Sequence, residues 1–138
     1  MLVGVNTITA HPEASTDYED YFLRRVLRSM AAVQENTRFV IFTHPGNHAA
    51  YEGWERVLVD PQRGGSRLPF GSKVSPVERA ASKAGVDRLL SPLESAPPSP
   101  SVAQVLFALD LAPWEPGPGE TAPGRPPAHT KSVLRACA

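Results

Sequence analysis

Hydroxyl, amide, carboxylate and imidazole side chains follow the apolar runs of this 138-residue chain. Those placed to contact a ligand are Thr7, Thr9, His11, Thr43, His44, Ser91, Glu94 and Asp110. Such groups donate and accept hydrogen bonds, which is the chemistry that recognises a polyhydroxylated ligand. Because the carboxyl ends of parallel strands face one crevice, the pattern places a polar site there. Polar residues also end strands for purely structural reasons, and position alone favours that interpretation.

Two histidines, His44 and His48, lie four residues apart, a spacing that on a helix puts two metal ligands on one face. Pro45 and Gly46 stand between them, and these residues disfavour a regular helix. No cysteine or third ligand accompanies the pair. We therefore expect both histidines to be turn residues and predict no metal site.

The loop after the first apolar run lacks a nucleotide-binding fingerprint. Residues 9–15 (TAHPEAS) contain no glycine, whereas a phosphate-binding turn needs glycine so that backbone amides can approach the ligand. No Walker sequence occurs either. The sequence predicts no nicotinamide, no P-loop nucleotide and no other cofactor.

Charge and hydropathy exclude several kinds of partner. Acidic and basic residues balance at 14 each, without a basic run, whereas nucleic acid and anionic lipid demand concentrated positive charge. No apolar run approaches the roughly 20 residues that span a bilayer, and residues 1–6 do not resemble a secretory signal. We expect a cytoplasmic protein that binds no nucleic acid and has no transmembrane segment. Peripheral membrane contact stays open.

Apolar runs alternate with amphipathic stretches along the chain. The predicted strands are residues 2–8, 38–43, 54–59, 86–90 and 102–109, and the predicted helices are residues 16–35, 75–84 and 130–138. Residues 16–19 and 75–78 fit capping boxes, and Gly85 fits a helix stop. Strands that alternate with helices predict right-handed crossovers. The fold class is therefore α/β, a Rossmann-like three-layer domain with a mostly parallel sheet.

The first predicted helix carries an apolar stripe that we expect it to bury. The stripe consists of Tyr18, Phe22, Val26, Leu27, Met30 and Val33. A chain of 138 residues has the size of one domain. Residues 1–91 form its regular α/β core, and residues 92–138 form a proline-rich segment with one further strand and a terminal helix.

Five short sequence segments of this chain, which we call strings, resemble segments that occur in the same order in a known protein family. They are residues 3–6 (VGVN), 19–27 (EDYFLRRVL), 39–47 (FVIFTHPGN), 84–92 (AGVDRLLSP) and 109–111 (LDL). Together they resemble the N-terminal domain of retaining GT-B glycosyltransferases of family 4, where the forms are IGVN, ETY-L-R-LL, F-VLFT-P-N, AGVD-LHSP and HDL. The resemblance spans nearly the whole chain and implies one half of a GT-B fold.

The resemblance implies a domain that binds the acceptor sugar or glycan, with Asn6, Thr43, Ser91 and Asp110 as its contacts. In the family, a second domain binds the nucleotide-sugar. The implied partner is therefore a donor-binding domain or a separate protein. Since transfer requires donor and acceptor to be positioned together, we expect these 138 residues to be inactive in isolation.

Two positions depart from the family pattern. The paired glycines that let the family's backbone approach the donor phosphates correspond to Thr16 and Asp17, and the histidine before Asp110 is Leu109. Leucine neither donates nor accepts a proton. An alternative function is therefore a non-catalytic binding or interaction module, a degenerate remnant of such a transferase.

Overall fold

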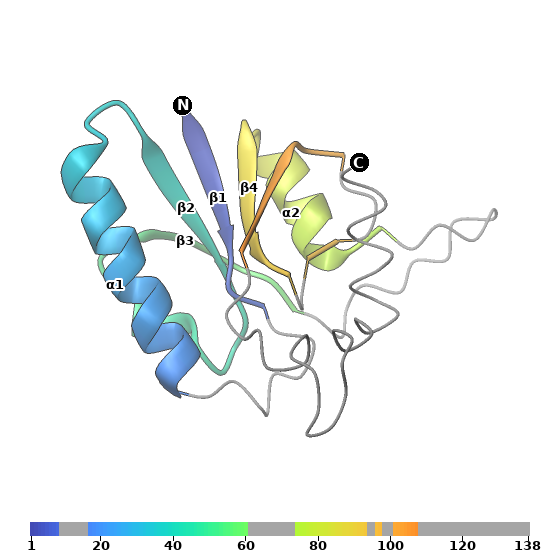
Figure 1. The fold of residues 1–138 in the computed structure, drawn as a ribbon. Coiled ribbons are helices and arrows are strands. Elements are labelled where there is room, and N and C mark those ends of the chain that lie inside the picture. The colour runs from blue at the N-terminus through green and yellow to red at the C-terminus, as the bar shows by residue number, and fades with distance from the viewer. Residues whose placement is uncertain (9–16, 61–73, 94–95, 98–100, 108–138) are drawn as a thin grey trace, which may run out of the picture.

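The protein folds around one sheet of parallel strands (Figure 1). The computed structural model describes residues 1–8, 17–60, 74–93, 96–97 and 101–107, with side chains of the first helix from Tyr21 onward. The strands are β1 (Leu2–Asn6), β2 (Arg38–Thr43), β3 (Glu55–Leu58), β4 (Arg88–Pro92) and β5 (Gln104–Phe107). Their spatial order is β3-β2-β1-β4-β5, and every pair is parallel. This confirms the predicted α/β class.

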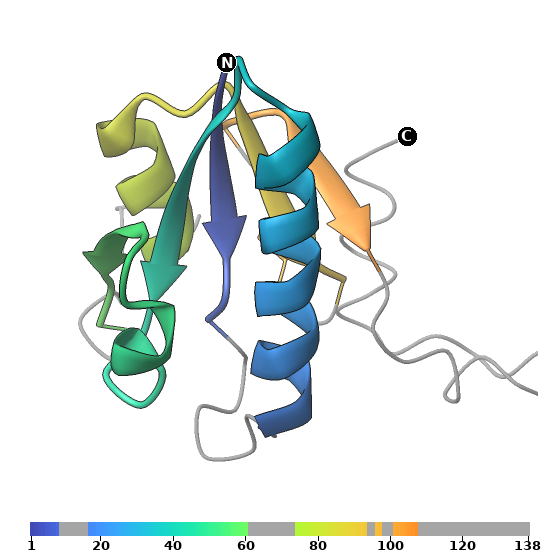
Figure 2. The same cartoon turned by 90° about the vertical axis from the view of Figure 1, so that its left-hand side faces the viewer.

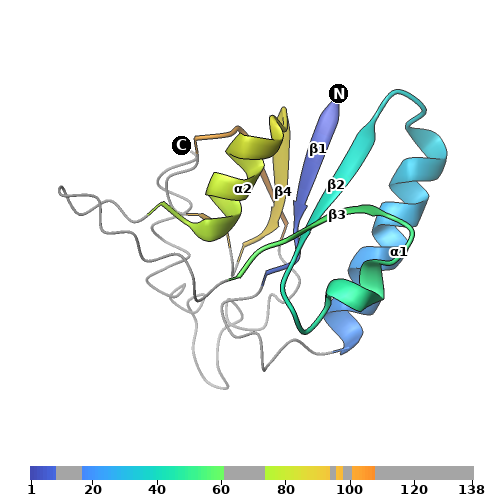
Figure 3. The ribbon, with the colours of Figure 1, turned by 180° about the vertical axis from the view of Figure 1, so that it is seen from behind.

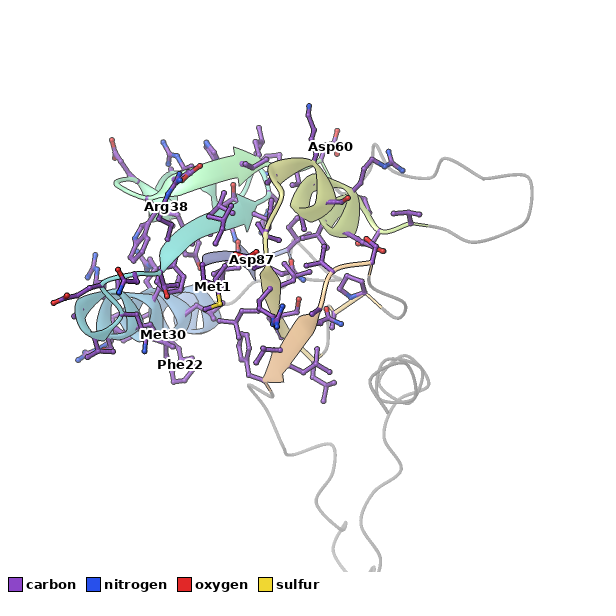
Figure 4. All side chains as sticks on the ribbon, turned by 90° about the horizontal axis from the view of Figure 1, so that it is seen from above. Met1, Phe22, Met30, Arg38, Asp60 and Asp87 are labelled. Carbon is purple, nitrogen blue, oxygen red and sulfur yellow. The ribbon has the colours of Figure 1, made fainter. Side chains whose placement is uncertain are left out.

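Two helices cover opposite faces of this sheet. Helix α1 (Asp17–Val33) connects β1 to β2, and helix α2 (Pro76–Ala84) connects β3 to β4. Figures 1 and 3 show α1 on one side of the strands and α2 on the other, and the view from above in Figure 4 shows the three layers. A short 3₁₀ turn, η2 (His48–Tyr51), precedes β3. Neither described helix is both long and apolar enough to cross a membrane.

Because successive side chains of a strand point to opposite faces of the sheet, the core residues form two groups, one on each face. Side chains of the α1 face are Val3, Val5, Leu27, Phe39, Ile41 and Tyr51. Those of the α2 face are Ile8, Val40, Phe42, Val59, Val77, Ala81, Val86 and Leu89. Strands β1 and β2 are buried on both faces because they lie between other strands and beneath helices.

Gly4 of β1 is a packing requirement of the α2 face. A Cβ atom built on Gly4 would lie 2.6 Å from Cε2 of Phe42 and 3.3 Å from side-chain atoms of Leu89 and Val86. Since real Cβ atoms do not approach backbone neighbours or rings this closely, the aromatic ring of β2 can fill the space only because β1 has no side chain there.

The described elements agree with most of the predicted ones. Strand β2 has the predicted bounds, whereas β4 runs from Arg88 to Pro92 and not over residues 86–90. The reason is the helix end. Gly85 adopts φ 67° as the predicted stop, and the Val86 amide still bonds to the Ala81 carbonyl at 3.3 Å. The predicted helix at residues 130–138 lies outside the described residues.

The predicted stripe of α1 is wrong in part. Leu23 and Leu27 are buried against the sheet, while Phe22 is 42% and Val33 is 74% exposed. Figure 4 shows Phe22 on the side of α1 that does not face β1 and β2. Two adjacent apolar stripes satisfy helical periodicity here, and periodicity does not say which one the sheet covers.

The predicted capping box at the start of α2 is also wrong. Ser75 occupies the N-cap but makes no side-chain cap hydrogen bond. The Glu78 carboxylate is buried and accepts a hydrogen bond from the main-chain amide of Ser101 at 2.7 Å. Glu78 therefore attaches α2 to the segment that enters β5.

Candidate functional site

The strand order creates a topological switch point between β1 and β4. From β1 the chain proceeds to β2 and β3 on one side, and it then returns through α2 to β4 on the other side. In open α/β sheets, ligands bind in the crevice beyond the carboxyl ends of the two strands at which the order reverses. Asn6 ends β1, and Ser91 is the next-to-last residue of β4.

Asn6 and Ser91 occupy neighbouring positions across the switch point. Val5 pairs with Leu90, so the next residues of the two strands lie opposite each other, about 4.8 Å apart along the pairing direction. By alternation both side chains belong to the α2 face, with Gly4 and Leu89. Both residues have 0% exposed surface. The structure thus brings together two of the predicted acceptor contacts.

The two side chains differ in their hydrogen bonds. The Asn6 Oδ1 atom accepts from the Ile8 amide at 3.0 Å, which turns the chain where it leaves β1. The Ser91 Oγ atom is buried and has no hydrogen-bond partner among the described residues. Burial of a hydroxyl without a partner costs free energy, roughly 1–3 kcal/mol in mutational data. A buried hydroxyl without a partner among the described residues is a candidate hydrogen-bonding group for a ligand or a water molecule.

Thr7 and Asn47 join the end of β1 to the turn after β2. The Thr7 hydroxyl donates to the Phe42 carbonyl at 2.9 Å and lies 3.1 Å from Asn47 Nδ2, which donates to it. The same Nδ2 atom donates to the Thr7 carbonyl at 3.0 Å, and Asn47 Oδ1 accepts from the His44 amide at 3.0 Å. Because Thr7 and Asn47 are both buried, this network holds the end of β1 against the turn after β2.

Both histidines serve the turn, as predicted. His44 Nδ1 accepts from the Gly46 amide at 3.1 Å, and the His48 amide donates to the His44 carbonyl at 3.0 Å. His48 Nδ1 lies 2.6 Å from the Thr43 hydroxyl. Within the described part of the chain, no three His, Cys, Asp or Glu side chains gather where a metal ion could be held.

Thr43 lies apart from Asn6 and Ser91. It ends β2 with 0% exposed surface, and by alternation it shares the α1 face with Phe39 and Ile41. Besides His48, its hydroxyl bonds to the Val57 carbonyl at 3.3 Å. Its hydrogen-bonding capacity is thus used within the protein, and its predicted contact with an acceptor stays a prediction.

Several predicted site residues lie outside the described residues. They are Thr9, His11, Thr16, Glu94, Leu109 and Asp110. Asp17 begins α1, and its side chain is not among those described. The site is therefore built on β1, β2, β4 and the turn that follows β2.

Sequence reasoning missed the part played by Asn47. The sequence His44-Pro45-Gly46-Asn47 indicates a turn, and the amide of Asn47 folds back onto that turn as expected of Asn in such a place. Its contact with Thr7, 40 residues earlier, depends on the parallel pairing of β1 with β2. No local pattern contains that information.

Away from the switch point, a pocket of about 750 Å³ lies between β3 and α2. Val57, Val59 and Ala80 contribute to its largely aliphatic lining, and Arg79 and Lys83 stand at its helical side. It opens beside an edge strand, whereas the switch point lies between central strands. The buried polar side chains converge at the switch point, so we take that crevice as the candidate site.

The described residues form a Rossmann-like α/β domain that has buried polar side chains at its switch point. No protein-family model matches the chain, and neither a curated protein nor a solved structure does.

Proposed function

We propose that this chain is the acceptor-side half of a retaining GT-B glycosyltransferase of the family 4 kind, a cytoplasmic protein that works with a separate nucleotide-sugar-binding domain. The observation that carries the proposal is the buried Ser91 Oγ, which lacks a partner among the described residues and lies beside Asn6 at the switch point. A sugar hydroxyl both donates and accepts hydrogen bonds, and it satisfies such a group.

Three of the strings that resemble the family include strand ends of the described sheet. Residues 3–6 lie in β1, residues 39–47 form β2 and its turn, and residues 84–92 join the end of α2 to the end of β4. All three end at or near the crevice. Their common position supports the proposal, although Gly4 also has a packing reason of its own.

The chemistry assigned to this half is positioning. The crevice holds an acceptor and orients one of its hydroxyls toward a donor bound by the other domain, which supplies much of the rate through proximity. Groups that stabilise the departing diphosphate belong to the donor side. Asn6 and Ser91 bind acceptor hydroxyls in this scheme, and the network of Thr7 and Asn47 holds the end of β1 against the turn after β2.

The test has a binding arm and a transfer arm. In the binding arm, the chain is titrated with monosaccharides and alkyl glycosides while main-chain amides are followed by NMR. We expect shifts at Thr7, Ile8 and Leu93, and about tenfold weaker binding in Ser91→Ala because one hydrogen bond is lost. Ser82→Ala is the matched control, since Ser82 is an exposed serine of α2.

In the transfer arm, donor domains of family 4 enzymes and a nucleotide-sugar are added in trans. Sugar transfer that Ser91→Ala slows, and Ser82→Ala does not, supports the proposal. Failure of every sugar to bind, together with no transfer with any donor domain, rejects it.

A non-catalytic binding module is the second candidate. Thr16, Asp17 and Leu109 favour it, because they replace the glycines and the histidine of the family pattern. The same experiment separates the two functions. Saturable sugar binding without transfer indicates the module, whereas transfer in trans indicates the half-enzyme.

A further inference from the structure

The two edges of the described sheet differ in how they resist pairing with another strand. Natural sheet edges are commonly protected by charged residues or proline. Strand β3 at one edge carries Glu55 and Arg56, and Glu55 forms an ion pair with Arg38 at 2.9 Å. Strand β5 at the other edge reads QVLF, with neither charge nor proline. Figure 2 shows β5 extending beyond the part of the sheet that α1 covers.

The main-chain groups of β5 point in known directions. The Ala103 carbonyl accepts from the Leu89 amide at 2.9 Å, and the Phe107 carbonyl accepts from the Leu93 amide at 2.8 Å. In a parallel strand, alternate residues direct their main-chain groups to opposite sides. Since Ala103 and Phe107 face β4, the amide and carbonyl of Gln104 and Leu106 face the open edge.

We propose that β5 pairs in antiparallel orientation with β5 of a second copy of this chain, around a twofold axis at Val105. In this register Gln104 lies opposite Leu106 of the second copy, and the two exchange both main-chain hydrogen bonds. Val105 lies opposite its own counterpart in a non-hydrogen-bonded pair, with Cα atoms about 4.5 Å apart. The main-chain amides and carbonyls of Gln104 and Leu106, which face away from β4, are therefore the groups that form the hydrogen bonds in this register.

The side chains of β5 fit the same register. Val105 is 51% exposed, and its pairing with Leu90 places it on the α1 face. Across the axis the two valines meet on one face of a continuous sheet, and β-branched pairs of this kind stabilise antiparallel strands. Phe107 is half-buried on the same face, so the apolar surfaces of the two copies adjoin.

The absence of charged residues in β5 favours a second copy of this chain as the partner that pairs with this strand. In a twofold antiparallel pair, residues at the axis and beside it face or neighbour their own counterparts, so a charge there meets an equal charge, which destabilises the pair. The neutral β5 satisfies this condition, and β3 with Glu55 and Arg56 does not.

Sedimentation equilibrium of the full chain tests the proposal with two matched substitutions. Val105→Lys puts a cation at the axis, while Leu58→Lys makes the same change on β3, where Leu58 is 55% exposed. We expect a dimer in the wild type, at least about tenfold weaker association in Val105→Lys, and an unchanged dimer in Leu58→Lys. A strictly monomeric wild type, or a dimer that Val105→Lys leaves intact, overturns the proposal.

Cysteine cross-linking tests the register and keeps the proposal falsifiable if Val105→Lys fails to fold. Cys137 is the only native cysteine, so Cys137→Ser provides a background without thiols. A Cα separation of about 4.5 Å lies within the range that a disulfide spans. Under mild oxidation we expect Val105→Cys to form a covalent dimer and Ala103→Cys, out of register on the same edge, to stay monomeric. Equal cross-linking at the two positions contradicts the twofold register.

Discussion

Strand β2 ends in Thr43 and strand β4 ends in Ser91 and Pro92, and the buried hydroxyls of Thr43 and Ser91 have different surroundings. At the end of β2, the Thr43 hydroxyl bonds to His48 and to the Val57 carbonyl. At the end of β4, the Ser91 hydroxyl is equally buried but has no partner among the residues that the structure describes. The end of β2 is a closed hydrogen-bonded turn, whereas near the end of β4 the Ser91 hydroxyl keeps hydrogen-bonding capacity that no described residue uses.

This difference separates structural polar residues from candidate binding residues. Both threonine and serine follow an apolar run, and both belong to strings that resemble the same family. Only the folded structure shows that the first is fully used within the protein. A buried polar group that is satisfied contributes stability, whereas one that is not satisfied lowers stability until something binds to it.

Among the proposed substitutions, we expect Asn47→Ala to destabilise the protein most, because it disrupts the hydrogen-bonded turn after β2. It removes the hydrogen bonds to the Thr7 carbonyl, the Thr7 hydroxyl and the His44 amide, and it leaves buried partners unsatisfied. We expect a loss of about 3 kcal/mol in the free energy of unfolding, measured by urea denaturation. Asn36→Ala, at an exposed asparagine, should change it by less than about 0.5 kcal/mol. Equal effects of the two changes would contradict the assigned role of Asn47.

A smaller loss is expected for Thr43→Val, which keeps the shape of the side chain and removes its hydroxyl. His48 and the Val57 carbonyl then lose their shared partner, and the free energy of unfolding should fall by about 1–2 kcal/mol. Thr37→Val, in the turn before β2 where Thr37 bonds through its main-chain amide, is the control. Denaturation curves that coincide for Thr43→Val and the wild type would refute this account of the turn.

The smallest effect on stability is expected for Ser91→Ala in the absence of ligand. Since the hydroxyl has no partner among the described residues, its removal should not lower the free energy of unfolding, and relief of the cost of burying it should raise that free energy by about 1 kcal/mol. Thermal denaturation with and without a bound sugar sharpens the comparison. The sugar should raise the Tm of the wild type more than that of Ser91→Ala, because ligands stabilise the state they bind. A loss as large as that of Thr43→Val would place Ser91 among the structural residues.

Local sequence patterns predicted the elements of the fold well where local chemistry decides them. The apolar run of β2 and the stop at Gly85 are examples, because strand burial and a left-handed C-cap both depend on neighbouring residues. Patterns failed where a distant segment decides. Glu78 bonds to Ser101 instead of its own helix, and the sheet covers Leu23 instead of Phe22.

The candidate site was predictable in position but only partly in composition. The position of Ser91 after an apolar run predicted it as a site residue, and the family resemblance implied Asn6; the register of β1 with β4 brings the two residues together. Position after an apolar run predicted Thr43 as a site residue as well, although the Thr43 side chain lies on the α1 face and not on the α2 face with Ser91. Asn47 was not nominated, since its role requires contact between a turn and the end of a strand 40 residues away. Topology, which single residues do not encode, supplies these relations.

The central place of β1 has a consequence for synthesis of the chain. Val3 pairs with Phe39 on one side and with Arg88 on the other, and the Leu2 amide donates to the Asp87 carboxylate at 2.7 Å. Figure 4 shows Met1 close to Asp87 and Arg38 across this end of the sheet. A ribosome therefore releases β1 before β2, and it releases β4, the second neighbour of β1, only after α2. Until then β1 offers one unpaired apolar side, and such long-range pairing slows folding and exposes nascent chains to aggregation. Chaperones that hold nascent chains have their longest opportunity to bind during this interval.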